Sequence, residues 1–201
     1  MIYFFSGTPG SGKSLHAVAE MLRYEKKGFP VLANFQLNPS ALRNPDRVRW
    51  AENKDMSPAM LERFAADYWR AEGGRVQEER ILLVLDECQL IFNSRQWQKN
   101  SSWIGFFTQH RKMGFSVILI AQDMRMVDKQ IRAVVEYEYK HRKLANAGFV
   151  GNVFSFILGS RFLYRREWAT VRSVGKGAAL GWKMGYYGRR VYHAYDTFKT
   201  W

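Results

Sequence analysis

Residues 7–14 read Gly-Thr-Pro-Gly-Ser-Gly-Lys-Ser, in which two glycines separated by four residues precede a lysine and a serine. Backbone amides of such a loop turn toward an anion, and the N-terminus of a following helix adds partial positive charge. A chance match arises in roughly 1% of chains of this length. The pattern therefore predicts a phosphate-binding loop whose contact residues are Gly7, Thr8, Pro9, Gly10, Ser11, Gly12, Lys13, Ser14 and Leu15.

Two side chains of this loop have predicted chemical roles. Lys13 is expected to reach the β- and γ-phosphates of a nucleoside triphosphate. Ser14 is expected to offer its hydroxyl oxygen to Mg²⁺, a small hard cation that prefers oxygen ligands. ATP and Mg²⁺ are the ligands that this pattern indicates.

A second candidate group follows an apolar strand. Ile81–Leu85 is continuously apolar and ends at Asp86 and Glu87. A carboxylate at the C-terminal end of a buried strand is the partner that a phosphate loop needs, so Asp86 is expected to hold the magnesium shell. Glu87 is expected to polarise the attacking water. Without the loop upstream, an ordinary strand exit would explain the same pair equally well.

Residues 117–121 form another apolar run, and Gln122 ends it. A glutamine at that strand tip is expected to hydrogen-bond the γ-phosphate or its attacking water. The alternative is a glutamine that only begins a loop, since polar residues are common where strands end.

Strand and helix patterns alternate on both sides of these groups. The expected strands are 2–5, 31–35, 81–85, 117–121 and 136–142, and the expected helices are 15–24, 58–70, 103–112 and a short one within 127–135. Residues 38–46 read as a loop, and 162–168 and 191–195 as strands added to the main sheet. Residues 145–158, apolar but broken by glycines, read as a hairpin or a lipid-touching loop.

This alternation predicts an α/β fold: a three-layer P-loop NTPase with a mainly parallel sheet and a β-rich, basic C-terminal extension. We expect residues 1–140 to form the NTPase core. Residues 141–201 are expected to be a basic, aromatic-rich extension packed on that core rather than an independent domain.

Composition limits the class of protein. Hydrophobic residues make up 47% of the 201, which suits a packed core. The single cysteine, Cys88, excludes an intramolecular disulfide, and the four histidines show no metal-ligand spacing. No window approaches the roughly 20 apolar residues of a membrane-spanning helix.

The charge is concentrated at one end of the chain. The net charge is +13, and from Lys140 onward twelve basic residues stand against Glu167 and Asp196. Such a segment suits nucleic acid phosphates or an anionic membrane surface. The alternative is a solvated basic surface without a partner.

The chain resembles the zonula occludens toxin (Zot) family, which is similar to the inner-membrane assembly ATPase of filamentous phages. The residues that carry the resemblance are 2–14, Leu85-Asp86-Glu87, Thr108–Phe115 with its His-Arg-Lys stretch, 118–122, 127–132 and Tyr195-Asp196-Thr197. The resemblance implies an ATP-hydrolysing domain at the cytoplasmic face of the bacterial inner membrane. It also implies a role in phage morphogenesis, with the membrane segment after residue 201.

The resemblance further implies a multimer in which an arginine of one subunit completes the next subunit's site. Arg111 is the first candidate, followed by Arg132 and Arg95. The implied partners are further copies of the chain, phage assembly proteins, single-stranded phage DNA and, through the basic C-terminal part, an anionic membrane surface.

Two other functions remain open. A GTP-dependent switch needs an Asn-Lys-x-Asp stretch, and in Asn53-Lys54-Asp55 the aspartate comes one position early. A scaffold that binds nucleotide without hydrolysing it, and that docks on a membrane or on phage proteins, would share every motif above. Only measured turnover separates that scaffold from an ATPase.

Overall fold

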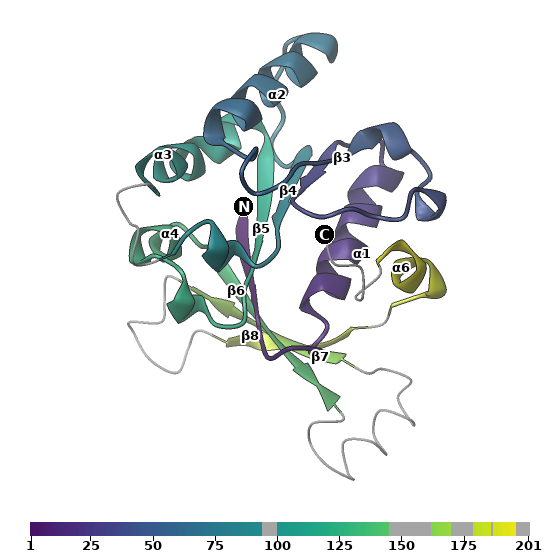
Figure 1. Cartoon of the computed structure of the whole chain (residues 1–201), viewed down its shortest axis with the longest axis vertical. Helices are drawn as coiled ribbons and strands as arrows, with labels where there is room; N and C mark the ends of the chain where they lie inside the picture. The colour runs from purple at the N-terminus through teal and green to yellow at the C-terminus, as the bar shows by residue number, and fades with distance from the viewer. Residues whose placement is uncertain (94–99, 145–161, 170–178, 186, 196–201) are drawn as a thin grey trace.

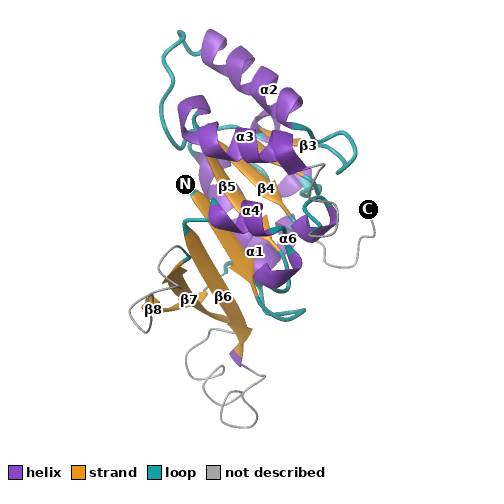
Figure 2. Cartoon of the chain, turned by 90° about the vertical axis from the view of Figure 1, so that its left-hand side faces the viewer, coloured by secondary structure: helices purple, strands orange, loops and turns teal. Residues whose placement is uncertain are grey.

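The computed structural model describes residues 1–93, 100–144, 162–169, 179–185 and 187–195. They form one sheet with helices on both faces (Figures 1 and 2). The strands are β1 (Ile2–Ser6), β2 (Val31–Ala33), β3 (Val48–Trp50), β4 (Ile81–Leu85), β5 (Phe115–Ile120), β6 (Tyr137–Lys143), β7 (Phe162–Trp168) and β8 (Ala179–Gly185). The helices are α1 (Lys13–Lys26), α2 (Pro58–Ala71), α3 (Ser101–Gln109), α4 (Lys129–Ala133) and α6 (Arg189–Ala194).

The sheet has the strand order β3-β2-β4-β5-β1-β6-β7-β8. The first six strands in this order run parallel, whereas β7 is antiparallel to both of its neighbours, β6 and β8. Strand β5 lies between β1 and β4, so β4 is two places from the phosphate-loop strand β1, and β2, the next strand along the chain, is three places from it. Because the carboxyl ends of parallel strands share an edge, the residues after β1, β5 and β4 meet there.

Alternating side chains give each face of the sheet its own core. Phe4 and Leu83 belong to the cluster beneath α2, α3 and α4, whereas Phe5 and Leu82 belong to the cluster beneath α1 and α6. Nearly every side chain of the central strands is buried, which explains the continuous apolar runs of β4 and β5. The predicted three-layer α/β fold is confirmed.

Several local signals act as the sequence indicates. Ser57 caps α2, since its hydroxyl accepts a hydrogen bond from the backbone N–H of Met60 at 3.3 Å, and Pro58 takes the first helical position. Gly114, with φ +83°, ends the helical turn before β5. The helix predicted over 103–112 is α3 followed by a short 3₁₀ turn at His110–Met113.

Three elements differ from the prediction. The strand expected over 191–195 is wrong: this segment lies in and directly after α6, because Val191, Ala194 and Tyr195 recur at helical spacing and pack against one core cluster. Strand β3 lies next to the predicted loop 38–46 and is only three residues long, too short for an alternating pattern. Strand β8 carries no turn or periodicity signal that the sequence analysis used.

Some predictions cannot be compared with the fold. The apolar segment 145–158 and Arg95 lie outside the described residues. The division into 1–140 and 141–201 stays a prediction, and its boundary falls within β6. Among the described residues, no helix has the length and apolar character needed to cross a bilayer.

Candidate nucleotide site

The phosphate loop connects β1 to α1, as its pattern requires. The tip, Thr8–Gly10, is exposed, and Lys13 is folded back beneath it. The ammonium group of Lys13 donates hydrogen bonds to the carbonyl oxygens of Gly7 at 2.8 Å and Thr8 at 3.1 Å. Burial lowers the pKa of Lys13, while the carboxylates of Asp86 and Glu87 oppose this shift. The lysine is therefore held against the loop by two of its carbonyl oxygens, at the start of α1.

Two glycines of the loop have no room for a side chain. A Cβ atom on Gly7 would lie 2.4 Å from the carbonyl oxygen of His141, and one on Gly12 would lie 2.6 Å from the ring of Phe162. Both glycines also have positive φ, 144° and 90°. Glycine is thus required at both positions, because β6 and β7 approach the loop closely.

The predicted metal ligands are in contact. The Ser14 hydroxyl donates a hydrogen bond to Asp86 Oδ2 at 2.8 Å, which joins the start of α1 to the carboxyl end of β4. Burial raises the pKa of Asp86, and the hydrogen bond from Ser14 opposes this rise. A hydroxyl and a partly buried carboxylate are oxygen donors of the type Mg²⁺ prefers, so the two residues fit the predicted ion.

Asn34, which the sequence analysis missed, fixes the position of Asp86. It follows β2, and its side-chain oxygen accepts a hydrogen bond from the Asp86 backbone N–H at 2.7 Å. Its amide nitrogen donates to the Asp86 carbonyl at 2.7 Å and to Asn53 Oδ1 at 2.7 Å. The only signal in the sequence is a polar residue at the end of a short strand, and this becomes informative once β2 and β4 are known to pair.

Glu87 lies beside Asp86 in an uncommon backbone conformation, with φ 46° and ψ 44°. Its backbone N–H donates to Asp86 Oδ1 at 2.9 Å. The side chain is exposed and accepts a hydrogen bond from Gln89 Nε2. A left-handed glutamate costs free energy, and such residues concentrate at functional sites.

Gln122 follows β5 and therefore lies between the phosphate loop and Asp86 in the strand order. Its carbonyl oxygen accepts a hydrogen bond from the Gly7 N–H at 3.0 Å, and its side chain is exposed. With Gly7 and Thr8 it lines a cavity of about 440 Å³ that is bordered on its far side by β6 residues. The predicted contact of this side chain with a phosphate or water stays a prediction.

The two arginine candidates within the described residues, Arg111 and Arg132, lie elsewhere. Arg111 precedes β5 and is thus at the amino edge of the sheet, where its guanidinium group donates to Glu136 Oε2 at 2.6 Å. Glu136 Oε1 accepts from the Ile2 N–H at 3.2 Å, which marks the start of β1. Arg132 lies near the end of α4. Within one chain Arg111 is remote from the loop, so a role at a nucleotide site requires a neighbouring subunit.

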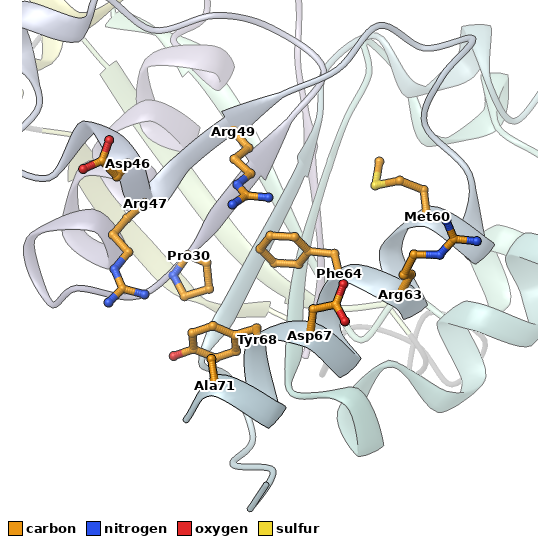
Figure 3. A pocket seen from close by; sticks show the side chains of 10 residues that line it. All are labelled: Pro30, Asp46, Arg47, Arg49, Met60, Arg63, Phe64, Asp67, Tyr68 and Ala71. Atoms are coloured by element: carbon orange, nitrogen blue, oxygen red, sulfur yellow. The ribbon is translucent and has the colours of Figure 1, made fainter. Parts of the chain in front are cut away.

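A second cavity of about 440 Å³ lies between β3 and α2 (Figure 3). The guanidinium group of Arg49 stands 5.3 Å from the centre of the Phe64 ring on one side of it. The residues that line the cavity are Pro30, Asp46, Arg47, Arg49, Met60, Arg63, Phe64, Asp67, Tyr68 and Ala71. None of them belongs to the nucleotide site.

This fold and this loop define the class of protein: the chain has the fold of P-loop NTPases. Sequence comparison gives the particular family. The profile described as "Zonular occludens toxin (Zot)" matches residues 1–170, and the chain belongs to that family.

Relatives by sequence include the Gene 1 proteins of Enterobacteria phage M13, 30% identical over 98% of this chain, and of Salmonella phage IKe, 32% identical over 98%. The chain spans 59% of the length of the first protein and 56% of the second.

Solved structures with a similar fold include the N-terminal domain of zonular occludens toxin from Neisseria meningitidis, with a TM-score of 0.55, 17% identity and coverage of 97% of this chain and 98% of that one. The genome packaging NTPase B204 from Sulfolobus turreted icosahedral virus 2, in complex with ATP-gammaS, gives a TM-score of 0.56 at 11% identity, over 91% and 95%. At these identities the likeness concerns the fold.

Proposed function

We propose that the chain is a Mg²⁺-dependent ATPase domain that acts in filamentous phage morphogenesis. One observation carries the catalytic part: the Ser14 hydroxyl and the Asp86 carboxylate, distant in sequence, are 2.8 Å apart at the base of a loop that encloses Lys13. The morphogenesis part is supported by membership of the Zot family and by the similarity to phage Gene 1 proteins.

Each side chain has one task in this proposal. Lys13 leaves the carbonyl oxygens of Gly7 and Thr8 and balances the charge of the β- and γ-phosphates. Ser14 and Asp86 would hold Mg²⁺, which would supply positive charge to the phosphate oxygens. Glu87 accepts a hydrogen bond from the attacking water and aligns it with the γ-phosphorus. Gln122, at the neighbouring strand tip, fixes the second hydrogen bond of that water.

The proposed setting follows from the family resemblance. The domain would lie at the cytoplasmic face of the bacterial inner membrane, assemble with copies of itself and act on phage assembly proteins. The basic C-terminal part suits single-stranded DNA or anionic lipid as a further contact.

Turnover measured across a wide range of protein concentration tests this proposal. We expect magnesium-dependent ATP hydrolysis whose rate per subunit rises with concentration, because the site is completed by a neighbour. Glu87→Gln should bind ATP and fail to hydrolyse it, whereas Lys13→Ala should lose binding as well. GTP in place of ATP tests the switch alternative.

Two results would contradict the proposal. Wild-type protein that binds no nucleotide would remove the site. Nucleotide binding without turnover in an assembled, membrane-bound longer chain would instead favour the scaffold that binds ATP to hold an oligomer together.

A further inference from the structure

A third cavity, of about 460 Å³, lies where α6 meets the 3₁₀ turn Pro39–Ala41. Figures 1 and 2 show α6 beside α1, and the Asn38 N–H donates to the Ala194 carbonyl oxygen at 2.9 Å. Among the described residues, every ionisable side chain that lines this α6 cavity is basic: Arg43, Arg189, Arg190 and His193. A hollow bounded by basic groups attracts anions.

A buried carboxylate fixes the wall of the α6 cavity. Glu25, in the last turn of α1, is 0% exposed. Its Oε2 accepts a hydrogen bond from Arg190 at 3.1 Å, and its Oε1 accepts from the backbone N–H groups of Arg43 and Asn44. Arg190 also donates to the Ala41 carbonyl oxygen at 2.6 Å. Three donors therefore compensate this buried charge, and together they hold α1, residues 41–44 and α6 in one arrangement.

The polar side of the cavity is held in place as well. The Nε2 atom of His193 lies 3.0 Å from Ser40 Oγ, which donates a hydrogen bond to Asn38 Oδ1 at 2.9 Å. Asn38 Nδ2 in turn donates to the His193 carbonyl oxygen at 3.3 Å. The fold thus positions an imidazole ring and a hydroxyl group beside the guanidinium groups.

Arg43 and Arg189 line the cavity from two different segments of the chain. Both side chains are exposed, and within the described part of the chain neither guanidinium group has an ion pair or a hydrogen bond. The guanidinium group is a planar fork of donors that matches the oxygens of a carboxylate or a phosphate. Two such forks are therefore available to a ligand, while Arg190 stays paired with Glu25.

The charges favour a phosphate monoester over a singly charged anion. Three guanidinium groups stand against the one buried carboxylate of Glu25, which leaves a net charge of +2 at the cavity. A phosphate monoester carries about −1.5 to −2 at pH 7 and has three strong acceptor oxygens. A carboxylate or a phosphodiester, with a single negative charge, would leave part of this charge unbalanced.

We propose that the α6 cavity is a second anion site, which binds a phosphate monoester. It is separate from the nucleotide site, because Glu25 is in the last turn of α1 and Ser14 in the first, about 17 Å apart along the helix. Two sources offer the same chemical group: a soluble phosphate ester, or a membrane lipid with a monoester headgroup. The inference does not depend on the proposed ATPase function, since the two sites share no residue.

Binding of two probes tests the site. Glycerol phosphate is the soluble probe, and vesicles of phosphatidylcholine mixed with phosphatidic acid are the membrane probe. The double variant Arg43→Gln with Arg189→Gln removes the two available guanidinium groups. It keeps the pair of Arg190 with Glu25 and the backbone N–H at position 43, so its melting temperature should stay close to that of the wild type.

A second double variant controls for net charge. Arg63→Gln with Arg75→Gln removes two exposed arginines that do not line the cavity, so it lowers the net charge by the same amount. We expect the Arg43 and Arg189 variant to bind one of the probes at least about 10-fold more weakly than the wild type, the effect of losing a charged hydrogen bond. The control variant and Lys13→Ala should bind that probe as the wild type does.

The two probes distinguish the sources. Weaker binding of glycerol phosphate indicates a soluble ester, and weaker binding of the vesicles alone indicates a lipid headgroup. The proposal would be overturned if the wild type bound neither probe, if the Arg43 and Arg189 variant bound both probes as the wild type does, or if the control variant lost as much binding.

A single-stranded oligonucleotide completes the test. If its binding alone depended on Arg43 and Arg189, the cavity would take a phosphodiester and the proposal would be wrong. Failure of the proposed ATPase function looks different, because wild-type protein would then bind no ATP while its binding of the two probes would be unaffected.

Discussion

At the scale of single residues, the site depends on side chains and backbone conformations that act together at one sheet edge. Ser14, Asp86 and Asn34 form a continuous set of hydrogen bonds between α1, β4 and β2. Glu87 stands next to this set in a left-handed conformation that a glutamate rarely adopts. The left-handed backbone conformation of Glu87 therefore lowers the stability of the folded protein, and a substitution can measure by how much.

Glu87→Gly and Glu87→Ala separate the carboxylate from the backbone strain. Both variants should lose ATP hydrolysis, because neither carries a carboxylate. The glycine variant should be the more stable of the two by about 0.5–1 kcal/mol, since glycine adopts φ 46° without a steric cost. Thermal unfolding of the two proteins checks this. A glycine variant that melts below the alanine variant would contradict the left-handed conformation.

At the scale of elements, two buried histidines join the phosphate-loop helix to the part of the sheet that follows it. His16 on α1 and His141 on β6 are joined by a hydrogen bond between Nδ1 and Nε2 of 2.8 Å. Burial lowers the pKa of His141 to about 4. Burial and the neighbouring His141 lower the pKa of His16 to about 3. Both rings are neutral in the folded protein near neutral pH.

These pKa values predict a loss of stability in acid. An unfolded histidine has a pKa of about 6.5, so below that pH the unfolded chain binds protons that the folded chain excludes. The contribution of the two neutral histidines to the free energy of unfolding should be complete above pH ~6.5. It should be lost as the pH falls toward their pKa values in the folded protein. Melting temperatures between pH 8 and pH 5 measure this.

Substitutions test whether His16 and His141 cause this pH dependence of the melting temperature. A double variant, His16→Gln with His141→Gln, should melt with a weaker dependence on pH in this range. His110 supplies part of the remaining slope, since burial lowers its pKa too. If the melting temperature of the double variant depended on pH as strongly as that of the wild type, the two histidines would not be its cause.

At the scale of the whole molecule, the two edges of the sheet carry different groups. The carboxyl edge carries the phosphate loop, Asp86 and Gln122, whereas Arg111 lies at the amino edge and is paired with Glu136. The proposed multimeric ATPase needs an arginine at the γ-phosphate, so Arg111 can serve only as a neighbour's residue.

Mixing two inactive variants tests this. The Lys13→Ala subunit lacks a working nucleotide site but keeps Arg111. The Arg111→Ala subunit keeps the nucleotide site but lacks the arginine. We expect each alone to be inactive and their mixture to regain part of the wild-type turnover, because mixed oligomers contain an intact site beside an intact arginine.

The controls separate catalysis from stability. Glu136→Gln keeps an acceptor for the Ile2 N–H and frees Arg111, so turnover should persist. The melting temperature of Arg111→Ala shows whether losing the ion pair unfolds the amino edge. Full turnover by Arg111→Ala alone would remove this residue from the mechanism, and the same mixing experiment would then be applied to Arg132.

The sequence by itself determined the local units of this protein. The strand, loop and helix around residues 7–14, the buried strand that ends at Asp86 and the capped helix that begins at Pro58 follow from signals within about ten residues of chain. Such signals specify backbone conformation directly, because glycine, proline, capping hydroxyls and apolar periodicity each act on their own neighbours.

Only the tertiary structure decided the contacts between those units. It placed β5 between β1 and β4, made the segment before Tyr195 a helix and brought Asn34 to Asp86. Strand order and side-chain partners depend on how segments that are distant in sequence pack together on the two apolar faces of the sheet. A residue such as Asn34 gains its role from a partner that local sequence patterns do not encode.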